Sequence, residues 1–193
     1  MSFLKNHPFA VETQFENSIV LSYAIAKEEL QGLIPECLEL DVFDNKWAFI
    51  ALALVKTKNL RPKGFSRFLG NDFILIGYRV FVQYTNKRGK RLRGLYILKS
   101  ETNKRKMSYF GNIFTHYNYT TTDISYLKDG ETLNISSKKS DLNISIQSDI
   151  LDIKLPETSP FNNWKEARRF AGPLPFTFKY NEKKKEVLII EGV

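Results

Sequence analysis

The chain has 193 residues, of which 42% are hydrophobic and 13% aromatic, and its formal net charge is +8 at pH 7. This length and composition predict a single globular domain over residues 1–193 and exclude a disordered chain. The longest apolar runs are too short to span a bilayer, and the amino terminus lacks a signal-peptide pattern. We therefore expect a cytoplasmic protein without a membrane partner. The only cysteine, Cys37, excludes an internal disulfide and is expected to be a small buried filler.

The excess positive charge is concentrated in two runs, residues 87–93 and 183–185. Each run lies near a predicted hairpin turn, where solvated lysines are common and keep sheet edges from pairing with other chains. A polyanion or nucleic-acid binder that uses these turns is one alternative function. Because the sequence contains no recognisable nucleic-acid-binding module, we rank nucleic acid last among the partners considered.

The first part of the chain predicts a strand followed by a short helix. Residues 9–26 alternate in hydropathy and then become nearly all apolar, which predicts one or two strands with a kink near Glu16. Residues 27–35 predict a helix whose buried face includes Leu33 and which Pro35 ends.

Two hairpins are predicted next. Residues 38–43 and 47–58 alternate as strands, and a tight turn at residues 44–45 joins them. Residues 73–84 and 91–99 form the second hairpin. Both faces of this second hairpin are partly apolar, which indicates a central position in a sheet or barrel.

A helix is predicted after the second hairpin, with Thr102 as its N-cap. Met107, Phe110 and Phe114 follow at helical spacing and predict its buried stripe. Basic residues fill the first turn of this helix, where the helix dipole disfavours cations. That position is typical of solvated charge, and also of a lysine that has a depressed pKa or faces an anion.

The rest of the chain predicts strands at residues 116–126, 132–138, 142–148 and 150–155, a short helix at residues 161–170, and a last hairpin of residues 176–180 and 187–190. No internal repeat or linker interrupts this pattern. The whole therefore predicts one mainly β domain, an antiparallel barrel or sandwich with about three short helices.

The motifs of several common chemistries are missing. The sequence has no glycine-rich phosphate loop, nucleophile elbow or zinc-type histidine pair. With His7 and His116 as the only histidines, a histidine-built metal site is not expected, and no cofactor is predicted.

The remaining candidates for catalysis are Lys99, Lys104 and Lys106, together with Glu101, which lies between Lys99 and Lys104 in the sequence. An amine beside other cations or in a low-dielectric cavity loses its proton more easily and can attack a carbonyl to form a Schiff base. Glu101 could orient that amine or transfer a proton. The alternative interpretation, which local sequence favours, is that these are solvated charges at a strand end and a helix start.

Candidate ligand-binding residues lie on the predicted strands. Arg79 shares a strand face with apolar residues, and an arginine in such surroundings usually has a partner or lines a cavity. It is the best candidate for holding an anionic ligand. Tyr78 lies beside it but points to the opposite face. Tyr117 belongs to an aromatic group that could line a cavity, and Lys99 and His116 complete the set.

Three segments of the chain, taken in order, resemble those of one known family. The first is the proline-x-x-leucine-x-leucine-aspartate segment at residues 35–41, which precedes a turn and a strand with Trp47. The second is the aromatic strand at residues 78–82 with a central Arg79, and the third is the strand–helix–strand region at residues 94–119. They resemble the uncharacterised bacterial family catalogued as domain of unknown function 2071, which is related in fold to acetoacetate decarboxylase.

This resemblance implies a closed or nearly closed antiparallel β-barrel with a central cavity and short flanking helices. In acetoacetate decarboxylase a lysine in the helix after a strand forms a Schiff base with a β-keto acid, and a neighbouring lysine lowers its pKa. The matching position here is Lys106, or Lys104 if the alignment shifts. Lys104-Arg105-Lys106 stands where the decarboxylase has a proline-lysine-lysine pattern.

Two leading hypotheses follow for the function. The first is a barrel that binds a small anionic or carbonyl-bearing ligand in its central cavity, with or without catalysis. The second is a lysine-dependent lyase or decarboxylase that acts on a keto acid through a Schiff base. Either is compatible with a homo-oligomer, and the identity of the small-molecule ligand is left open.

Overall fold

A computed structural model describes residues 9–149, 153–182 and 184–191 of the chain. In this part the protein is mainly β, with three α-helices and one short 3₁₀ helix. The strands are β1 (Val11–Ala26), β2 (Glu39–Leu40), β3 (Trp47–Pro62), β4 (Asn71–Thr85), β5 (Arg91–Thr102), β6 (Tyr119–Thr121), β7 (Ser125–Asp129), β8 (Thr132–Ser137), β9 (Leu142–Gln147), β10 (Phe176–Asn181) and β11 (Glu186–Glu191). The helices are α1 (Lys27–Gln31), η2 (Arg67–Leu69), α2 (Arg105–Phe114) and α3 (Trp164–Ala171).

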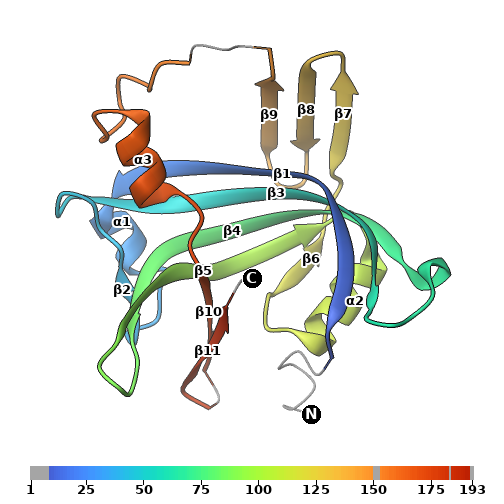
Figure 1. Ribbon diagram of the computed structural model, residues 1–193, viewed down its shortest axis with the longest axis horizontal. Helices are drawn as coiled ribbons and strands as arrows, with labels where there is room; N and C mark the ends of the chain where they lie inside the picture. Colours follow the sequence, from blue (N-terminus) through green and yellow to red (C-terminus); the bar gives the residue numbers. More distant parts are fainter. Residues whose placement is uncertain (1–8, 150–152, 183, 192–193) are drawn as a thin grey trace.

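The main sheet has the strand order β1-β3-β4-β5-β10-β11, with β2 attached to β4 and β6 attached to β5 (Figure 1). Most neighbours are antiparallel, but β10 and β6 both run parallel to β5. These parallel pairs depart from the expected antiparallel pattern, because each follows a long connection that returns the chain in the same direction. Strands β1 and β11 lie at the two margins of the described sheet, so its closure into a barrel remains a prediction.

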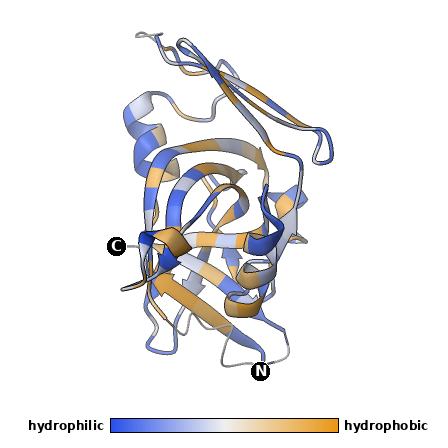
Figure 2. Ribbon diagram, turned by 90° about the vertical axis from the view of Figure 1, so that its right-hand side faces the viewer, coloured by the Kyte–Doolittle hydropathy of each residue, from blue (hydrophilic) through white to orange (hydrophobic). Residues whose placement is uncertain are grey.

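A second, three-stranded sheet of β7, β8 and β9 projects from the main sheet on the side of β1 (Figures 1 and 2). It is the antiparallel meander that the sequence predicts, except that the expected first strand is divided into β6 and β7. Ile135 of β8 is fully buried against Ile76 of β4 and Leu54 of β3. This apolar contact holds the small sheet on the large one.

The core is divided between the two faces of the main sheet. Phe49 on β3 and Phe81 on β4 pack against Phe161 and Phe170 from the α3 region. On the opposite face, Val80 packs with residues of α1, β5 and β10. The sheet is therefore covered on both faces, as the hydrophobicity of both faces of the β4–β5 hairpin indicates.

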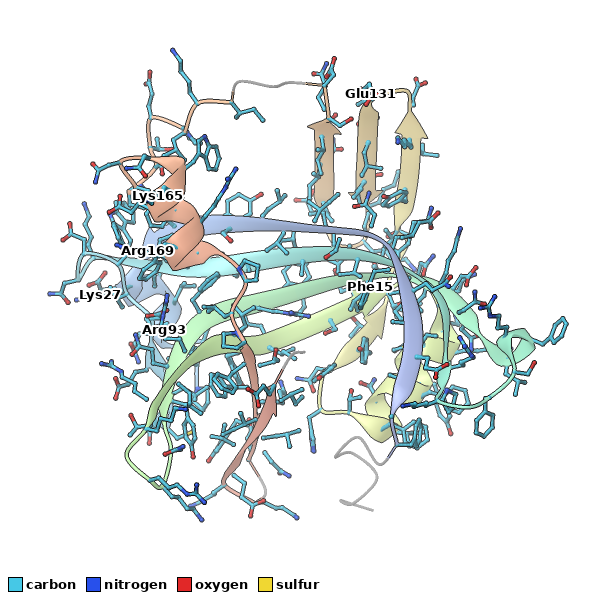
Figure 3. The ribbon with its side chains drawn as sticks, in the orientation of Figure 1. Phe15, Lys27, Arg93, Glu131, Lys165 and Arg169 are labelled. Carbon is cyan, nitrogen blue, oxygen red and sulfur yellow. The ribbon has the colours of Figure 1, made fainter. Side chains whose placement is uncertain are left out.

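A buried ion pair joins β2 to the central hairpin. The Asp41 carboxylate, which is 2% exposed, accepts hydrogen bonds from Gln83 and from Arg93 Nε, the latter at 2.7 Å. Arg93, which is labelled in Figure 3, also donates to the carbonyl of Phe170 at the end of α3, and its guanidinium lies over the Phe170 ring. A buried carboxylate requires such partners, so Arg93 has a structural role.

The structure corrects several predictions for residues 27–47. Helix α1 ends at Gln31, ahead of Pro35, and Leu33 is 49% exposed. The predicted strand at residues 38–43 is reduced to β2, and it pairs with β4; only a single bridge links Phe43 to Trp47. The alternation of residues 38–43 predicts a strand but does not specify which strand it pairs with, so pairing with β4 was not predictable. Cys37 is exposed and is not a buried filler.

Other local predictions are confirmed. Strand β1 has an irregularity near Glu16, and the β4–β5 and β10–β11 hairpins pair as expected. The prediction of Thr102 as N-cap of the next helix is wrong, because strand β5 continues to Thr102. Helix α2 starts later, and Lys104 occupies its N-cap position. Part of the strand predicted at residues 150–155 lies outside the described residues, and residues 153–155 are not in a strand.

Candidate functional site

Arg79 lies on β4 two residues after Gly77, so both residues belong to the same face of the strand. A Cβ atom added to Gly77 would lie 3.3 Å from Arg79 Nε and 3.6 Å from Nη2. The guanidinium therefore lies across the backbone of its own strand, in space that the missing side chain leaves open. The register continues from Gly77 to Ser100 on β5 and to Tyr119 on β6, which places Tyr119 on the same face.

Arg79 is half-buried, and its guanidinium has no carboxylate partner in the described part of the chain. Its buried Nε has no hydrogen-bond partner among the described residues. Burial lowers the pKa of Arg79 from its ordinary value. A buried polar group without a partner is costly, so this atom marks a place where an added acceptor would be stabilising.

Two tyrosines lie close enough to Arg79 to interact with it electrostatically. Burial raises the pKa of Tyr117 to about 12, against the opposing effect of the Arg79 charge. Burial also raises the pKa of Tyr119. Both phenols are therefore protonated at neutral pH, and a hydroxyl in that form can donate to an anion. Neither the guanidinium nor the two protonated phenols bring a negative charge to this place.

Helix α2 fixes the position of Tyr119 through side chains at helical spacing. The Asn112 amide accepts from the Tyr119 backbone N–H at 2.7 Å and donates to its carbonyl at 2.8 Å, and Ser108 donates to the same carbonyl. A Cβ atom on Gly111 would lie 2.3 Å from the Tyr119 ring. The glycine thus lets the ring pack against the helix backbone, and the helix acts as a support for β6.

This support corrects the predicted buried stripe of α2. Gly111 is the buried residue of the helix, whereas Phe110 is 52% exposed. The predicted Met107 and Phe114 are half-buried. The inward face carries small and polar residues instead of aromatic ones, because it must accommodate the Tyr119 ring and bond to the backbone of β6. The predicted catalytic residues Lys104 and Lys106 lie on the exposed side.

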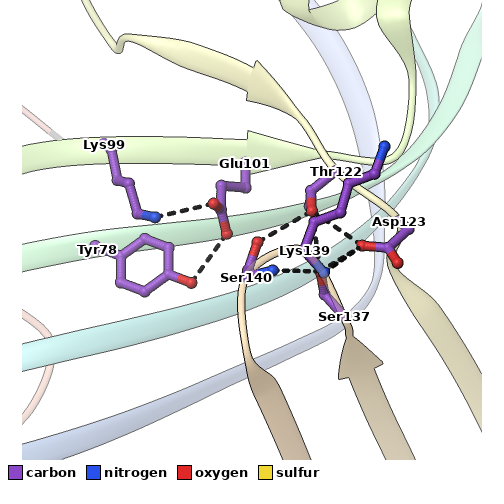
Figure 4. A network of polar contacts seen from close by, with 8 residues as sticks. All are labelled: Tyr78, Lys99, Glu101, Thr122, Asp123, Ser137, Lys139 and Ser140. Atoms are coloured by element: carbon purple, nitrogen blue, oxygen red, sulfur yellow. Dashed lines mark hydrogen bonds and ion pairs between the residues drawn. The ribbon is translucent and has the colours of Figure 1, made fainter.

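Glu101, Lys99 and Tyr78 are brought together on the other face of the sheet (Figure 4). Lys99 Nζ donates to Glu101 Oε1 at 2.9 Å and lies 4.4 Å from the centre of the Tyr78 ring. The Tyr78 hydroxyl donates to Glu101 Oε2 at 2.9 Å. Burial, with the Glu101 carboxylate as a further cause, raises the pKa of Tyr78. Both oxygens of this buried carboxylate are thus satisfied, and the Lys99 amine is engaged as a donor.

A neighbouring polar cluster attaches the small sheet to this region (Figure 4). Thr122 donates its backbone N–H to the carbonyl of Thr102, next to Glu101. Asp123 accepts from the Ser137 hydroxyl at 2.8 Å and from the backbone N–H of Lys139, and these bonds lower the pKa of Asp123 to about 2. The cluster is explained as an anchor for the β8–β9 turn.

The predicted site residues are therefore divided between two places. Arg79 lies near Tyr117 on one face of the sheet. His116, which directly precedes Tyr117 in the sequence, is half-buried. Tyr78, with Lys99 and Glu101, lies on the other face. The strand period explains this division, because neighbouring residues on β4 point in opposite directions.

The basic run at the β4–β5 turn is partly neutralised. Arg91 forms an ion pair with Glu39 at 2.9 Å, and Arg93 is paired with Asp41. Arg88 at the tip of the turn is exposed. Binding of a polyanion at this turn remains a prediction.

Sequence reasoning missed Lys179 on β10. This lysine is 6% exposed, its Nζ donates to the carbonyl of Ile97 at 3.0 Å, and it lies 5.4 Å from the centre of the Tyr96 ring. Burial lowers the pKa of Lys179, against a smaller opposing effect of Glu182. The sequence signal for this burial is weak: Lys179 stands between two aromatic residues of a predicted strand, Phe178 and Tyr180.

A pocket of about 670 Å³ lies next to Lys179. Tyr96, which contacts the Lys179 amine, lines this pocket together with Tyr180, Glu182 and the segment of residues 32–37. Tyr96 thus belongs both to the lining of this pocket and to the surroundings of the buried amine.

The described residues lack two features that would point to a particular class of function. None of their helices has the length and apolar character needed to cross a membrane. Nor do these residues contain a group of three or more histidine, cysteine, aspartate or glutamate side chains placed to hold a metal ion.

The architecture is that of the acetoacetate decarboxylase fold. The chain superposes on the acetoacetate decarboxylase of Legionella pneumophila subsp. pneumophila str. Philadelphia 1 with a TM-score of 0.56 and 13% identity, over 95% of this chain and 65% of that one. A second solved structure, from structural studies of acetoacetate decarboxylase, gives a TM-score of 0.57 and 13% identity over 95% and 66%. The chain thus spans slightly less than two thirds of the length of these proteins, and the likeness concerns the fold.

The sequence profile of the DUF2071 family, described as an uncharacterized conserved protein, matches residues 12–174. The chain belongs to this family. No curated protein matches it in sequence. The resemblance in the segments around Trp47, Arg79 and Gly94 is thereby confirmed at the level of family and fold.

Proposed function

We propose that the protein binds a small carboxylate-bearing molecule through Arg79. The observation that carries this proposal is the buried Arg79 Nε, which has no acceptor among the described residues. A carboxylate would supply two acceptor oxygens to the planar guanidinium, and a desolvated site makes such a charge-assisted bond strong.

The surroundings favour a small anion over a neutral ligand. Tyr117 and Tyr119 are protonated at neutral pH and so can act as donors, and neither competes with the ligand by bringing a negative charge. The structural neighbours are named for acetoacetate, which is a small carboxylate with a ketone group. Acetoacetate, pyruvate and acetate are therefore the first compounds to test, and inorganic phosphate serves as an oxyanion of different shape.

Replacement of Arg79 by methionine is expected to weaken carboxylate binding at least tenfold, which corresponds to about 1.4 kcal/mol. The reason is that methionine keeps much of the apolar stem but removes every donor. Arg79→Lys should bind with intermediate affinity, because an ammonium keeps the charge and loses the bidentate geometry. Isothermal titration calorimetry with each compound measures the effect, and circular dichroism checks the fold.

The matched control is Arg88→Met, which removes an exposed arginine from the β4–β5 turn. Its affinity should equal that of the wild type. Equal binding by Arg79→Met and the wild type, or no binding of any of the four compounds to the wild type, would refute the proposal.

A second candidate function is imine chemistry at a lysine, and the observation that favours it is the burial of Lys179. Burial lowers the pKa of its amine, and the amine forms no ion pair with a carboxylate of the described residues. Lys104 and Lys106, in contrast, are exposed. The unprotonated amine would add to a ketone carbon, and the carbonyl oxygen would leave as water. The product is an imine, and imine formation is the first step in the reaction of a lysine-dependent lyase.

Borohydride reduction in the presence of acetoacetate or pyruvate tests this candidate, because hydride converts an imine into a stable secondary amine. We expect a mass increase on the peptide that contains Lys179, and its loss in Lys179→Met. Lys184→Met, at the exposed β10–β11 turn, should keep the adduct. An adduct confined to Lys104, Lys106 or Lys99, or no adduct at all, argues against Lys179.

A further inference from the structure

The turn between β3 and β4 places large apolar side chains in solvent. Phe68 in η2 is 99% exposed, and its neighbours Phe65 and Leu69 are 56% and 59% exposed. A group of exposed apolar side chains on a soluble domain usually marks a contact surface. The turn projects from the molecule at the right of Figure 1, so these side chains lie on a convex tip.

Hydrogen bonds and close packing hold this turn in one conformation. The Arg61 side chain donates to the carbonyl of Phe65 at 3.0 Å and to the carbonyl of Asn59 at 3.1 Å. A Cβ atom on Gly70 would lie 2.8 Å from the Cα atom of Asn59, so the two arms of the turn are in close contact. An ordered backbone therefore presents the apolar side chains.

Helix α2 lies at the same end of the main sheet and adds further apolar surface. Asn103, just before the helix, accepts a hydrogen bond from the backbone N–H of Ile74, near the start of β4. Strand β4 begins two residues after η2, which brings the helix and the turn to one end of the sheet. Tyr109 and Phe110 of α2 are 65% and 52% exposed. In Figure 2 this end of the molecule faces the viewer.

Cations without carboxylate partners accompany these apolar side chains. Residues 60–71 and 104–114 each contain three lysine or arginine residues and no aspartate or glutamate. Arg61 is paired with Glu12 at 2.8 Å. The other five cations form no ion pair with a carboxylate of the described residues. Three of them stand at the start of α2, where the helix dipole disfavours cations and an external anion would offset that cost.

We propose that residues 63–69 and 104–110, called the tip surface, dock on a membrane that carries anionic phospholipid. Lys63 and Arg67 contact the headgroup phosphates, and Phe68 and Leu69 enter the boundary between the headgroups and the acyl chains. Apolar insertion and charge attraction act together in this contact. Docking of this kind needs no segment long enough to cross the bilayer, so it is compatible with the short apolar runs of the sequence.

The apolar side chains favour a lipid surface over another polyanion. A nucleic acid attracts the same cations, but Leu69 has no ring on which a base can stack. The protrusion of Phe68 favours a surface that yields, because headgroups part around an inserted ring, whereas a folded partner needs a complementary hollow. The tip surface does not include Arg79, so docking is independent of the proposed carboxylate binding.

Sedimentation of the full chain with vesicles measures the docking. We expect binding to vesicles of equal parts phosphatidylcholine and phosphatidylserine, weakening as salt is added, and binding at least about tenfold weaker to pure phosphatidylcholine. Phe68→Ala should lower the partition coefficient about tenfold, because an inserted aromatic ring is lost. Arg67→Gln should lower it about fivefold, because one cation near the charged surface is lost.

Two matched controls remove similar side chains elsewhere. Leu127→Ala truncates an apolar residue that is 65% exposed on β7, and Arg88→Gln removes an exposed cation beyond the opposite end of β4. Both should dock as the wild type does. Arg79→Met should also dock normally, so a failure of carboxylate binding and a failure of docking can be told apart.

Hydrogen–deuterium exchange of the unaltered chain gives a second readout. Amides of residues 63–69 and 104–110 should exchange more slowly when the mixed vesicles are added. Equal binding to both kinds of vesicle, binding to neither, or unchanged docking of Phe68→Ala and Arg67→Gln would each overturn the proposal. Binding of a single-stranded oligonucleotide without binding to vesicles would also overturn it and assign the tip surface to nucleic acid.

Discussion

Gly94→Val is expected to lower the free energy of unfolding by about 3 kcal/mol, the upper end of the usual cost of overpacking. Gly94 on β5 lies opposite Phe176 in the parallel pair with β10. A Cβ atom at this position would lie 2.4 Å from the carbonyl oxygen of Phe176 and 2.6 Å from the ring of Phe178. The backbone oxygen cannot move unless the whole strand shifts. Phe178 is fully buried, so its ring has no free space to enter either.

Urea denaturation followed by tryptophan fluorescence measures this loss as a lower midpoint at an unchanged slope. Gly32→Val is the control, because no atom lies within 4 Å of a Cβ at Gly32 and its φ of −72° suits any residue. Its effect should stay within about 1 kcal/mol. If the two valine variants unfold at the same urea concentration, the parallel contact between β5 and β10 does not constrain position 94.

Phe49→Ala is expected to cost about 3–5 kcal/mol, the range measured for large aromatic truncations in cores. Phe49 is 1% exposed, and its ring centre lies 5.4 Å from Phe161, 5.3 Å from Phe170 and 5.9 Å from Phe81. The truncation leaves a cavity between β3 and the α3 region, because the sheet backbone cannot collapse into it. The loss of stability should therefore be accompanied by loosening of α3.

Urea denaturation gives the free energy, and hydrogen exchange over residues 161–171 reports the loosening. Phe68→Ala removes the same atoms from a side chain that is 99% exposed and should change stability by less than about 0.5 kcal/mol. Unchanged exchange of α3 in Phe49→Ala would mean that the aromatic cluster does not hold this helix on the sheet.

Features that depend on neighbouring residues were predictable from the sequence. The β4–β5 hairpin follows from two alternating runs around a turn in which Gly89 has a φ of 74°, a conformation that glycine adopts readily. Arg79 was singled out because a cation on an apolar strand face usually has a partner or lines a cavity. Its Nε is buried and has no partner among the described residues, and its role in ligand binding stays a prediction. The division between Tyr78 and Arg79 also follows from the strand period alone.

The sequence could not predict which lysine is buried. Lys104 and Lys106 stand in the expected place after β5, yet they are exposed, because the face of α2 that packs is the one with Ser108 and Gly111. Lys179 is buried because β10 returns beside β5 across more than 70 residues of intervening chain. Local spacing contains no information about such a return.

By itself, the sequence determined the family, the mainly β fold, the hairpins and the candidate arginine, since these depend on alternation, turn residues and local segments. Only the tertiary structure decided the partner of β2, the parallel neighbours of β5, the supporting face of α2 and the exposure of each lysine. The physical reason is that burial and strand pairing are set by contacts between residues far apart in the chain. A one-dimensional pattern of hydropathy shows which residues can be buried, whereas the packing of distant elements selects those that are.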